Sequence, residues 1–541
     1  MNNSYSKIEP TNPVKEIEVL IVGAGPAGLM MACQLAIHAI SFRIIDKKEH
    51  PTTYSGALII QARSVEILNQ MGIAQKVIRE GIIANNISIV FNGKQLLNIP
   101  VKNIGSGLTK FPYLLMVEQS KTEQLLTEFI NDKGIRIERR TELVSFSQNK
   151  EGVTSRIKKF DGKEETIKTQ YLIAADGGQS TIRKQLNIPF IGKAHQKSLF
   201  ITDCKARTDL PSDEICFSFS DKTISGFFPL CNGKWRVDGA ITRELEKRGT
   251  LTFEDVEKHF SERLRMNTKL YSPEWFSVFH SHQRYAPSFQ QNRCFLLGDA
   301  AHIHSPVGAQ GMNTGLQDAF NLGWKLAYVI RGKAKPKLLD TYTAERLPIA
   351  KKIISATDSI FNLVTSDHFF TKTIRINVIP FLLKSLFPLF GNRNLIRQYL
   401  FKSISEIDIH YRESVLSRQA SITKSPFYLP RPGDRLPYIL YNDKDKEVNI
   451  QERVTGKSFH LLILTKDSSS SEIMKVAEKY NNILSFEIIS YSTQNNHLFK
   501  RLGITKSGCY LIRPDLYIAF QSDKLRAKQL ENYLQDNFGL R

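Results

Sequence analysis

The sequence contains few cysteines. Six are spread over 541 residues, and no two of them stand at Cys-x-x-Cys spacing. Without such pairs, neither a disulfide framework nor a zinc ribbon is indicated. The protein is therefore predicted to work in a reducing compartment, the cytoplasm.

A long apolar segment is also missing. The N-terminal sequence MNNSYSKIEPTNPVKEIE is polar and has no apolar stretch suited to a secretory signal. Residues 378–390 are rich in apolar side chains, but this run is too short to cross a bilayer and contains Lys384 and two prolines. The sequence excludes a transmembrane helix here and leaves core packing, a homodimer interface and peripheral membrane contact open.

Acidic residues are scarce relative to basic ones. The chain has 74 Lys and Arg against 53 Asp and Glu, a formal net charge of +21. Such a surface concentrates anions, including nucleic acid, anionic lipid and acidic substrates. No basic helix or aromatic-basic stripe accompanies the charge, so nucleic acid is not predicted as a partner.

The chain does contain strands that end in glycine and aspartate. Residues 18–46 predict a strand, a tight turn, a helix and a second strand, and further strands are predicted at 171–175 and 293–297. If these strands are parallel, their carboxyl ends lie at the edge of the sheet where such sheets bind ligands. Short alternating segments between about 190 and 285 predict an inserted sheet, and residues 315–405 are mostly helical. A Pro/Gly-rich stretch at 430–437 precedes a small C-terminal α/β unit.

The first of these turns carries a nucleotide-binding pattern. Gly23-Ala-Gly25-Pro-Ala27-Gly28 follows a strand and opens a helix, so its glycines permit a tight turn and a close approach to a pyrophosphate. Asp46 ends the next strand at the spacing of a carboxylate that binds an adenosine ribose, and Lys47 follows it. These residues predict a dinucleotide site but leave NAD(P) and FAD open.

Two further motifs indicate which dinucleotide binds. They are Asp176-Gly-Gly-Gln-Ser-Thr-Ile-Arg183 and Gly298-Asp299-Ala-Ala-His302, and the second continues into the run from His304 to Leu326. With them, the chain resembles the FAD-dependent aromatic hydroxylases of the phenol hydroxylase type, which are class A flavoprotein monooxygenases. The resemblance implies that FAD is contacted by Arg63, Gln119, Asp176, Arg183, Gly298, Asp299, Pro306, Gly308, Gly311, Met312 and Asn313.

The resemblance also implies an activity. An NADPH- or NADH-dependent enzyme would use O2 to hydroxylate a phenolic or polyketide-like ring through a flavin C4a-hydroperoxide. Phenol hydroxylases carry an Asp shortly before a turn glycine, but here Thr53-Tyr54-Ser55 precedes Gly56, which argues against simple phenol as substrate. The alternative function is a flavin-binding interaction or membrane-surface protein without hydroxylase activity. A flavin halogenase is disfavoured because the three tryptophans form no Trp-x-Trp element.

The expected fold is α/β. It comprises a split Rossmann-like FAD-binding domain at 1–186 and 286–405 with a helical extension, an inserted mixed-sheet substrate domain at 187–285, a linker at 406–440 and a thioredoxin-like domain at 441–541. Cys509 is the only cysteine of that last domain, so thiol exchange is not expected.

Two sets of candidate residues have competing interpretations. Phe217, Phe219, Phe227, Phe228, Trp235 and Arg236 of the inserted sheet could line a substrate pocket, or they could be core aromatics and an ion-pair partner. The pairs His280/His282 and His302/His304 have a spacing that suits a metal on one strand face. Since His302 and His304 belong to the flavin motifs, no metal is predicted.

Overall fold

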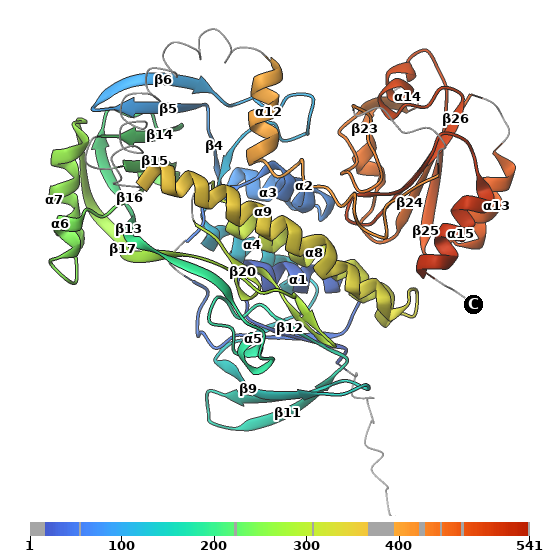
Figure 1. Cartoon of the computed structure of the whole chain (residues 1–541), viewed down its shortest axis with the longest axis horizontal. Coiled ribbons are helices and arrows are strands. Elements are labelled where there is room, and N and C mark those ends of the chain that lie inside the picture. Colours follow the sequence, from blue (N-terminus) through green and yellow to red (C-terminus); the bar gives the residue numbers. More distant parts are fainter. Residues whose placement is uncertain are drawn as a thin grey trace, which may run out of the picture.

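The computed structural model describes residues 17–52, 56–220, 224–305, 308–365, 394–420, 428–443, 446–466 and 470–538 (Figure 1). The turn at 53–55, Pro306 and the apolar segment 378–390 lie outside these ranges. Within them, no helix is long and apolar enough to span a membrane.

A six-stranded sheet forms the centre of the N-terminal half, with the order β18-β19-β12-β1-β2-β8. The first strand, β1, pairs in parallel with β2 and β12, and β12 pairs in parallel with β19. Its carboxyl edge therefore gathers the three predicted strand ends, which confirms the predicted βαβ unit. The elements are β1 (Val19–Val22), α1 (Pro26–Ile37), β2 (Phe42–Ile45), β8 (Ile137–Glu138), β12 (Tyr171–Ala174), β18 (Gln290–Gln291) and β19 (Cys294–Leu296).

Smaller elements surround this sheet. One three-stranded sheet has the order β3-β7-β4 and another the order β11-β10-β9. Their strands are β3 (Ile59–Ile60), β4 (Ile82–Ile83), β7 (Leu115–Met116), β9 (Thr141–Gln148), β10 (Val153–Lys159) and β11 (Glu164–Thr169); the nearby helices are α2 (Ala62–Gln70), α3 (Ala74–Arg79), α4 (Gln119–Asn131) and α5 (Thr181–Gln185).

An eight-stranded mixed sheet lies beside the first, with the order β20-β17-β13-β16-β15-β14-β5-β6. It contains the predicted inserted strands β13 (Ile191–Thr208), β14 (Glu214–Phe219), β15 (Ile224–Leu230), β16 (Lys234–Ala240) and β17 (Thr268–Tyr285), together with β20 (His302–Ile303). It also includes β5 (Asn86–Phe91) and β6 (Lys94–Pro100), which the sequence assigned to the first domain; β5 joins β14 in the parallel sense.

The two faces of this sheet have different neighbours. Phe200, Phe227 and Val237 pack against Val256 and Phe260 of helix α7 (Phe253–Leu264), which follows the short helix α6 (Arg243–Glu246). We call this the outer face. On the opposite, inner face, Ile215, Phe217 and Phe228 pack against Leu58, Leu114 and Met116 of the central region.

Long helices and a separate sheet complete the chain. Helix α8 (Gly311–Ile330) is buried along almost its whole length, as expected of a core helix, and is followed by α9 (Asp340–Thr365) and α12 (Asn394–Ile404). The C-terminal sheet has the order β21-β27-β26-β24-β25. Its region contains β21 (Arg418–Gln419), β22 (Leu440–Asp443), β23 (Lys446–Asn449), β24 (Phe459–Thr465), α13 (Ser471–Lys479), β25 (Leu484–Ser490), α14 (Asn496–Leu502), β26 (Ser507–Ile512), β27 (Ile518–Ser522) and α15 (Ala527–Phe538).

Candidate cofactor site

The glycine turn between β1 and α1 combines tight packing with an open space. A Cβ on Gly23, whose φ is +103°, would lie 2.2 Å from the Ala175 carbonyl oxygen, and a Cβ on Gly28 would lie 2.0 Å from the Gly23 oxygen. A Cβ on Gly25 would meet no atom within 4 Å. Since Gly25 stands at the N-terminus of α1, whose amides attract anions, this space fits a pyrophosphate.

Asp46 fixes the position of that turn. Its Oδ2 accepts a hydrogen bond from the backbone N–H of Ala24 at 2.7 Å, and its Oδ1 accepts one from Lys48 N–H at 2.8 Å. The Arg139 guanidinium lies 3.6 Å from Oδ2. Asp46 therefore ties the end of β2 to the glycine turn, and Lys47 is exposed beside it.

The end of β12 carries an acceptor without a partner. Asp176 Oδ2 accepts hydrogen bonds from the backbone N–H groups of Thr181 and Ile182, at 2.8 and 3.3 Å. Its Oδ1 is buried and has no partner among the described residues, and burial raises the pKa of this carboxyl. Because a buried polar atom normally has a partner, Oδ1 marks a place for a ligand donor.

Arg183 links the second and third strand ends. Its guanidinium donates hydrogen bonds to the carbonyl oxygens of Gly178 at 2.8 Å and Ala300 at 2.9 Å, and lies 3.8 Å from the centre of the Phe190 ring. Arg183 therefore stabilises the arrangement of the two turns at the carboxyl edge of the sheet.

At the third strand end, small residues let three elements approach one another. A Cβ on Gly298, whose φ is +52°, would lie 3.1 Å from Ala27 Cβ, and a Cβ on Gly315 would lie 3.3 Å from the same atom. Ala27 thus packs where α1, this turn and α8 converge. Asp299, next to Gly298, is accessible to solvent. The chain around it nevertheless desolvates the carboxyl group and raises its pKa, as expected for a carboxylate that lines a concave site.

The start of α8 is held by Asn313. Its Oδ1 accepts a hydrogen bond from Gln61 N–H at 2.9 Å, and its Nδ2 donates to the carbonyl oxygens of Ile59 and Ala309, each at 2.9 Å. The Asn313 side chain is therefore committed to the backbone. The predicted residues Gly308, Gly311 and Met312 can offer a ligand the backbone of the loop before α8 and the free N–H groups of its first turn.

Gln119 lies close to the same region, at the start of α4. Its Oε1 accepts a hydrogen bond from Ala57 N–H at 3.1 Å, and its Nε2 donates to Glu123 Oε1 at 2.8 Å. Burial raises the pKa of Glu123. Glu123 therefore supports the side chain of Gln119.

Arg63 has partners that the sequence did not indicate. It is buried, donates hydrogen bonds to Glu66 at 3.2 Å and to the Asp515 carbonyl oxygen at 2.7 Å, and lies 5.2 Å from the centre of the Tyr517 ring. These contacts lead to the C-terminal region. Arg63 therefore links the cofactor-binding half to the C-terminal region, and its contact with the cofactor stays a prediction.

The candidate pocket residues divide between the two sheet faces. Phe217 and Phe228 lie on the inner face, with ring centres 5.7 Å apart. Arg236 of β16 is the cross-strand partner of Phe228 of β15 and therefore lies on the same face. Trp235 lies on the outer face with Phe227, where α7 covers them. Because neighbouring residues of a strand point to opposite faces, Trp235 and Phe227 are removed from the predicted pocket.

Arg236 forms the ion pair considered for it from sequence. It donates two hydrogen bonds to the Asp203 carboxylate, at 2.8 and 2.7 Å, and Trp275 Nε1 donates to the same carboxylate at 2.7 Å.

The histidine pairs do not assemble. His280 and His282 are exposed on β17, whereas His302 is buried and contacts Asp318 at 2.7 Å. His304 is half-buried, and desolvation of its ring lowers its pKa to about 4. In the part of the chain that the structure describes, no three His, Cys, Asp or Glu side chains are arranged to hold a metal.

The sequence did not predict the network of charged residues that holds the Gly298 turn against α8. Asp318 on α8 accepts hydrogen bonds from Gly298 N–H at 3.1 Å and from Arg346 Nε at 2.7 Å. Arg346 also donates to the Thr314 carbonyl oxygen at 3.1 Å. A charged residue inside the apolar run of α8 was the only sign of this network in the sequence.

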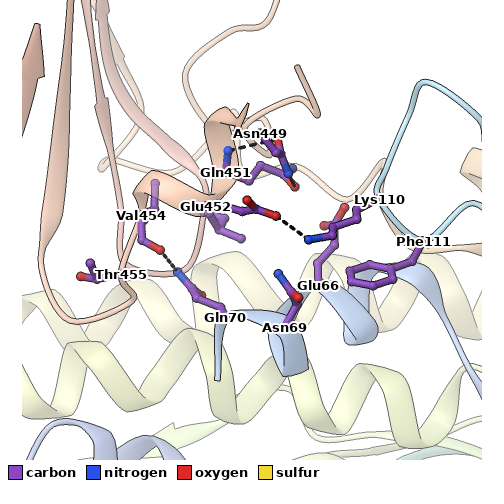
Figure 2. Close-up of a pocket in the computed structure, with 11 residues that line it drawn as sticks. Glu66, Asn69, Gln70, Lys110, Phe111, Asn449, Gln451, Glu452, Val454 and Thr455 are labelled. Atoms are coloured by element: carbon purple, nitrogen blue, oxygen red, sulfur yellow. Dashed lines mark hydrogen bonds and ion pairs between the residues drawn. The ribbon is translucent and has the colours of Figure 1, made fainter. Parts of the chain in front are cut away.

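A cavity of about 180 Å³ lies elsewhere, between α2 and residues 449–455 (Figure 2). Lys110 and Glu452 form an ion pair of 2.6 Å across it. Gln70 Nε2 donates hydrogen bonds to the carbonyl oxygens of Val454 and Pro514, at 3.0 and 3.1 Å. This cavity therefore belongs to the junction with the C-terminal region, not to the glycine edge.

Comparison with known families accounts for most of the chain. Residues 16–357 match the family described as FAD binding domain, and residues 429–540 match the family described as aromatic-ring hydroxylase, C-terminal. The chain belongs to the FAD-binding aromatic-ring hydroxylases. This hydroxylase is accordingly a FAD-dependent monooxygenase, and the open space at Gly25, the unpaired Asp176 Oδ1 and the accessible Asp299 fit that cofactor.

Individual relatives match between about two thirds and nearly all of the chain. The hydroxylase is 30% identical over 540 residues to 6-methylpretetramide 4-monooxygenase of Streptomyces rimosus, covering 96% of this chain and 93% of that one. It is 33% identical over 362 residues to rifampicin monooxygenase of Streptomyces venezuelae, covering 65% and 72%. The solved anhydrotetracycline hydroxylase of Streptomyces rimosus superposes with a TM-score of 0.77 at 27% identity, covering 97% and 99%.

Proposed function

We propose that this monooxygenase hydroxylates a polycyclic, polyketide-like phenol. The observation that carries the proposal is the similarity to 6-methylpretetramide 4-monooxygenase, which extends over 93% of that protein's length. The likeness to the solved anhydrotetracycline hydroxylase supports the same class of substrate. NADPH or NADH supplies the two electrons, and one ring C–H becomes C–OH while the second oxygen atom of O2 leaves as water.

The cofactor residues act by binding and orientation. The space at Gly25 and the first amides of α1 would hold the pyrophosphate of FAD, with Asp46 keeping the turn in place. Asp176 Oδ1 and Asp299 would accept hydrogen bonds from the cofactor, and the first turn of α8 would face its ring. Bound FAD supplies the electron transfer and the activation of O2, while the protein positions the substrate and excludes water.

We infer the following domain organisation. The FAD-binding domain spans 1–186 and 286–405, and β5 and β6 join the substrate domain at 187–285. The order β24-α13-β25-α14-β26-β27-α15, with one parallel and two antiparallel pairs, supports a thioredoxin-like domain after a linker at 406–440. Burial raises the pKa of Cys509 to about 12, so that domain is structural. Six free cysteines support the cytoplasm as the compartment.

The test is a substrate screen with the purified holoprotein. NADPH and NADH oxidation is measured with anhydrotetracycline, rifampicin, aklavinone, pentachlorophenol and phenol, and products are analysed by mass spectrometry under ¹⁸O2. We expect a polycyclic phenol to accelerate oxidation and to gain one labelled oxygen atom. If none of the compounds accelerates it, or if the product oxygen comes from water, the proposal is wrong and the non-catalytic flavoprotein alternative gains support.

A further inference from the structure

The inner face of the eight-stranded sheet exposes apolar side chains around the carboxyl group of Asp238. Ile201, Phe217, Phe228 and Phe279 are partly exposed there, whereas the outer-face neighbours Phe200, Phe227 and Val237 are buried. Figure 1 shows α7 on the far side of this sheet from α8 and α9. An incompletely covered apolar face directed toward the cofactor-binding half fits a flat aromatic ring.

Asp238 lies in the middle of this face. It pairs with Ile201 of β13 on one side and with Gly226 of β15 on the other. Ile201 in turn pairs with Ser277 of β17. The carboxylate is partly exposed, as the apolar side chains around it are. A substrate ring placed on this face would therefore contact Asp238.

One carboxylate oxygen of Asp238 is used and the other is free. Oδ1 accepts a hydrogen bond from Gly226 N–H at 2.9 Å, whereas Oδ2 has no partner within the described ranges. A Cβ on Gly226 would lie 2.5 Å from Oδ1 and 2.6 Å from Phe228 Cε2, so a glycine there makes room for the carboxylate. Asp203, another carboxylate of this face, has both oxygens occupied by Arg236 and Trp275.

A donor accompanies the free acceptor. Arg236 stands two residues before Asp238 on the same strand face, and its Nη1 is buried without a partner in the described structure. The side chain of Arg236 is 3% exposed, so this N–H group is shielded from water. A free carboxylate oxygen and a free guanidinium N–H on one apolar face are the complementary groups that a phenolic hydroxyl needs.

We propose that Asp238 is the base that accepts the proton of the substrate's phenolic hydroxyl. The inference rests on the proposed function and specifies its substrate as a ring with a free hydroxyl directed toward the sheet. The O–H bond breaks, the proton moves to Asp238 Oδ2, and the bonding pair stays on the substrate oxygen, which Arg236 Nη1 stabilises. The added electron density makes the ring carbon a better nucleophile, and the proton returns when the product regains its hydroxyl.

The electrostatic surroundings suit this role. Burial raises the pKa of Asp238 to about 6, and the hydrogen bond from Gly226 N–H and the charge of Arg236 partly oppose this rise. The charged neighbours are Arg236 on the same strand and its partner Asp203 on β13; Gly226 and Phe228 of β15 and Ser277 and Phe279 of β17 carry no charge. A base with this pKa is ionised at neutral pH and yet stronger than an ordinary carboxylate. The assignment also supplies the carboxylate that Thr53-Tyr54-Ser55 lacks.

The test compares Asp238→Asn with Glu274→Gln, which removes an exposed carboxylate paired with Lys234 on the same sheet. The probe is anhydrotetracycline, or the compound of the screen that the wild type hydroxylates. We expect Asp238→Asn to lower the rate of product formation about 100-fold. The absorbance of ionised probe bound to the oxidised holoprotein should also disappear, while FAD content stays at the wild-type level. Glu274→Gln should match the wild type in every measurement.

Two further measurements keep the proposal testable if Asp238→Asn does not fold. Asp238→Glu keeps a carboxylate and should retain the ionised probe, and the wild-type kcat/KM should fall below about pH 6. Wild-type turnover and ionised probe in a folded Asp238→Asn, or a flat wild-type pH profile in this range, would overturn the assignment. A wild type that hydroxylates none of the compounds would instead refute the proposed function.

Discussion

Gly25 and Gly28 occupy one turn, but each is a glycine for a different reason. Gly25 has φ −79°, which any residue adopts, and its missing side chain leaves open space. Gly28 is in contact with the Gly23 backbone. Gly25→Ala should therefore weaken FAD binding at least tenfold, about 1.4 kcal/mol, and leave the melting temperature of the apoprotein unchanged. Gly28→Ala should destabilise the apoprotein itself by about 1–3 kcal/mol.

The two variants are compared by titrating apoprotein with FAD and by thermal unfolding without it. The matched pair separates a ligand effect from a packing effect, because both substitutions add the same methyl group three residues apart. Equal loss of apoprotein stability in both variants would contradict the assignment of the open space to the cofactor.

Glu406 is a second residue whose environment predicts a measurement. It is buried, Gln317 donates a hydrogen bond to its Oε2, and its Oε1 has no partner among the described residues. Burial raises its pKa to about 8. Because the folded-state pKa exceeds that of the unfolded chain, its contribution to stability is complete below about pH 4.5 and is lost as the pH rises through about 8.

Glu406→Gln should remove this loss, since an amide stays neutral. Between about pH 6 and about pH 9, the melting temperature of the wild type should fall further than that of the variant, by an amount that reflects about 1.4 kcal/mol for each pH unit from about 6 up to the folded-state pKa of about 8. Parallel curves over this range would show that Glu406 is ionised in the folded protein.

At the scale of single elements, the sequence predicts what is encoded locally. The β1-α1-β2 unit and the turns at Asp176 and Gly298 were recognised because each motif lies within one strand, turn and helix. The alternating residues of β16 predicted a strand with two faces, but not that α7 would cover Trp235. Which face is covered depends on a helix that begins almost twenty residues later in the chain.

Long-range partners explain the other differences. Arg63 donates to the Asp515 carbonyl oxygen, and β5 pairs with β14 more than one hundred residues away. No local pattern specifies either contact. Asp238 did leave a sign in the sequence, because Lys234-Trp-Arg-Val-Asp238 alternates charged with apolar side chains. Alternation places such charged positions on one face of a strand, but only the structure shows which of their polar atoms have partners.

At the scale of the whole molecule, the C-terminal region is tied to the cofactor-binding half through buried charges. Arg513 donates hydrogen bonds to both Glu345 oxygens, at 2.7 and 2.9 Å, and Lys325 of α8 donates to Glu345 at 2.8 Å. Apolar contacts accompany them, since Trp324 and Tyr328 of α8 pack against Phe459. The helix that begins at the cofactor site therefore also forms part of the core beneath the C-terminal sheet.

This continuity predicts that the two regions unfold together. Arg513→Ala leaves Glu345 and Asp515 buried with too little positive charge, so we expect it to lower the free energy of unfolding by about 3–5 kcal/mol. Urea unfolding is followed by the fluorescence of Trp324 at the junction, in a background in which Trp235 and Trp275 are replaced by Phe, and by release of FAD. Both signals should move to lower urea concentration together. Arg418→Ala removes an exposed ion pair with Asp536 and should cost less than about 1 kcal/mol. A buried charge that stabilises both regions must destabilise both when its partner is removed. Two separate transitions in the wild type, or an Arg513→Ala protein as stable as Arg418→Ala, would therefore mean that the C-terminal region and the cofactor-binding half unfold independently.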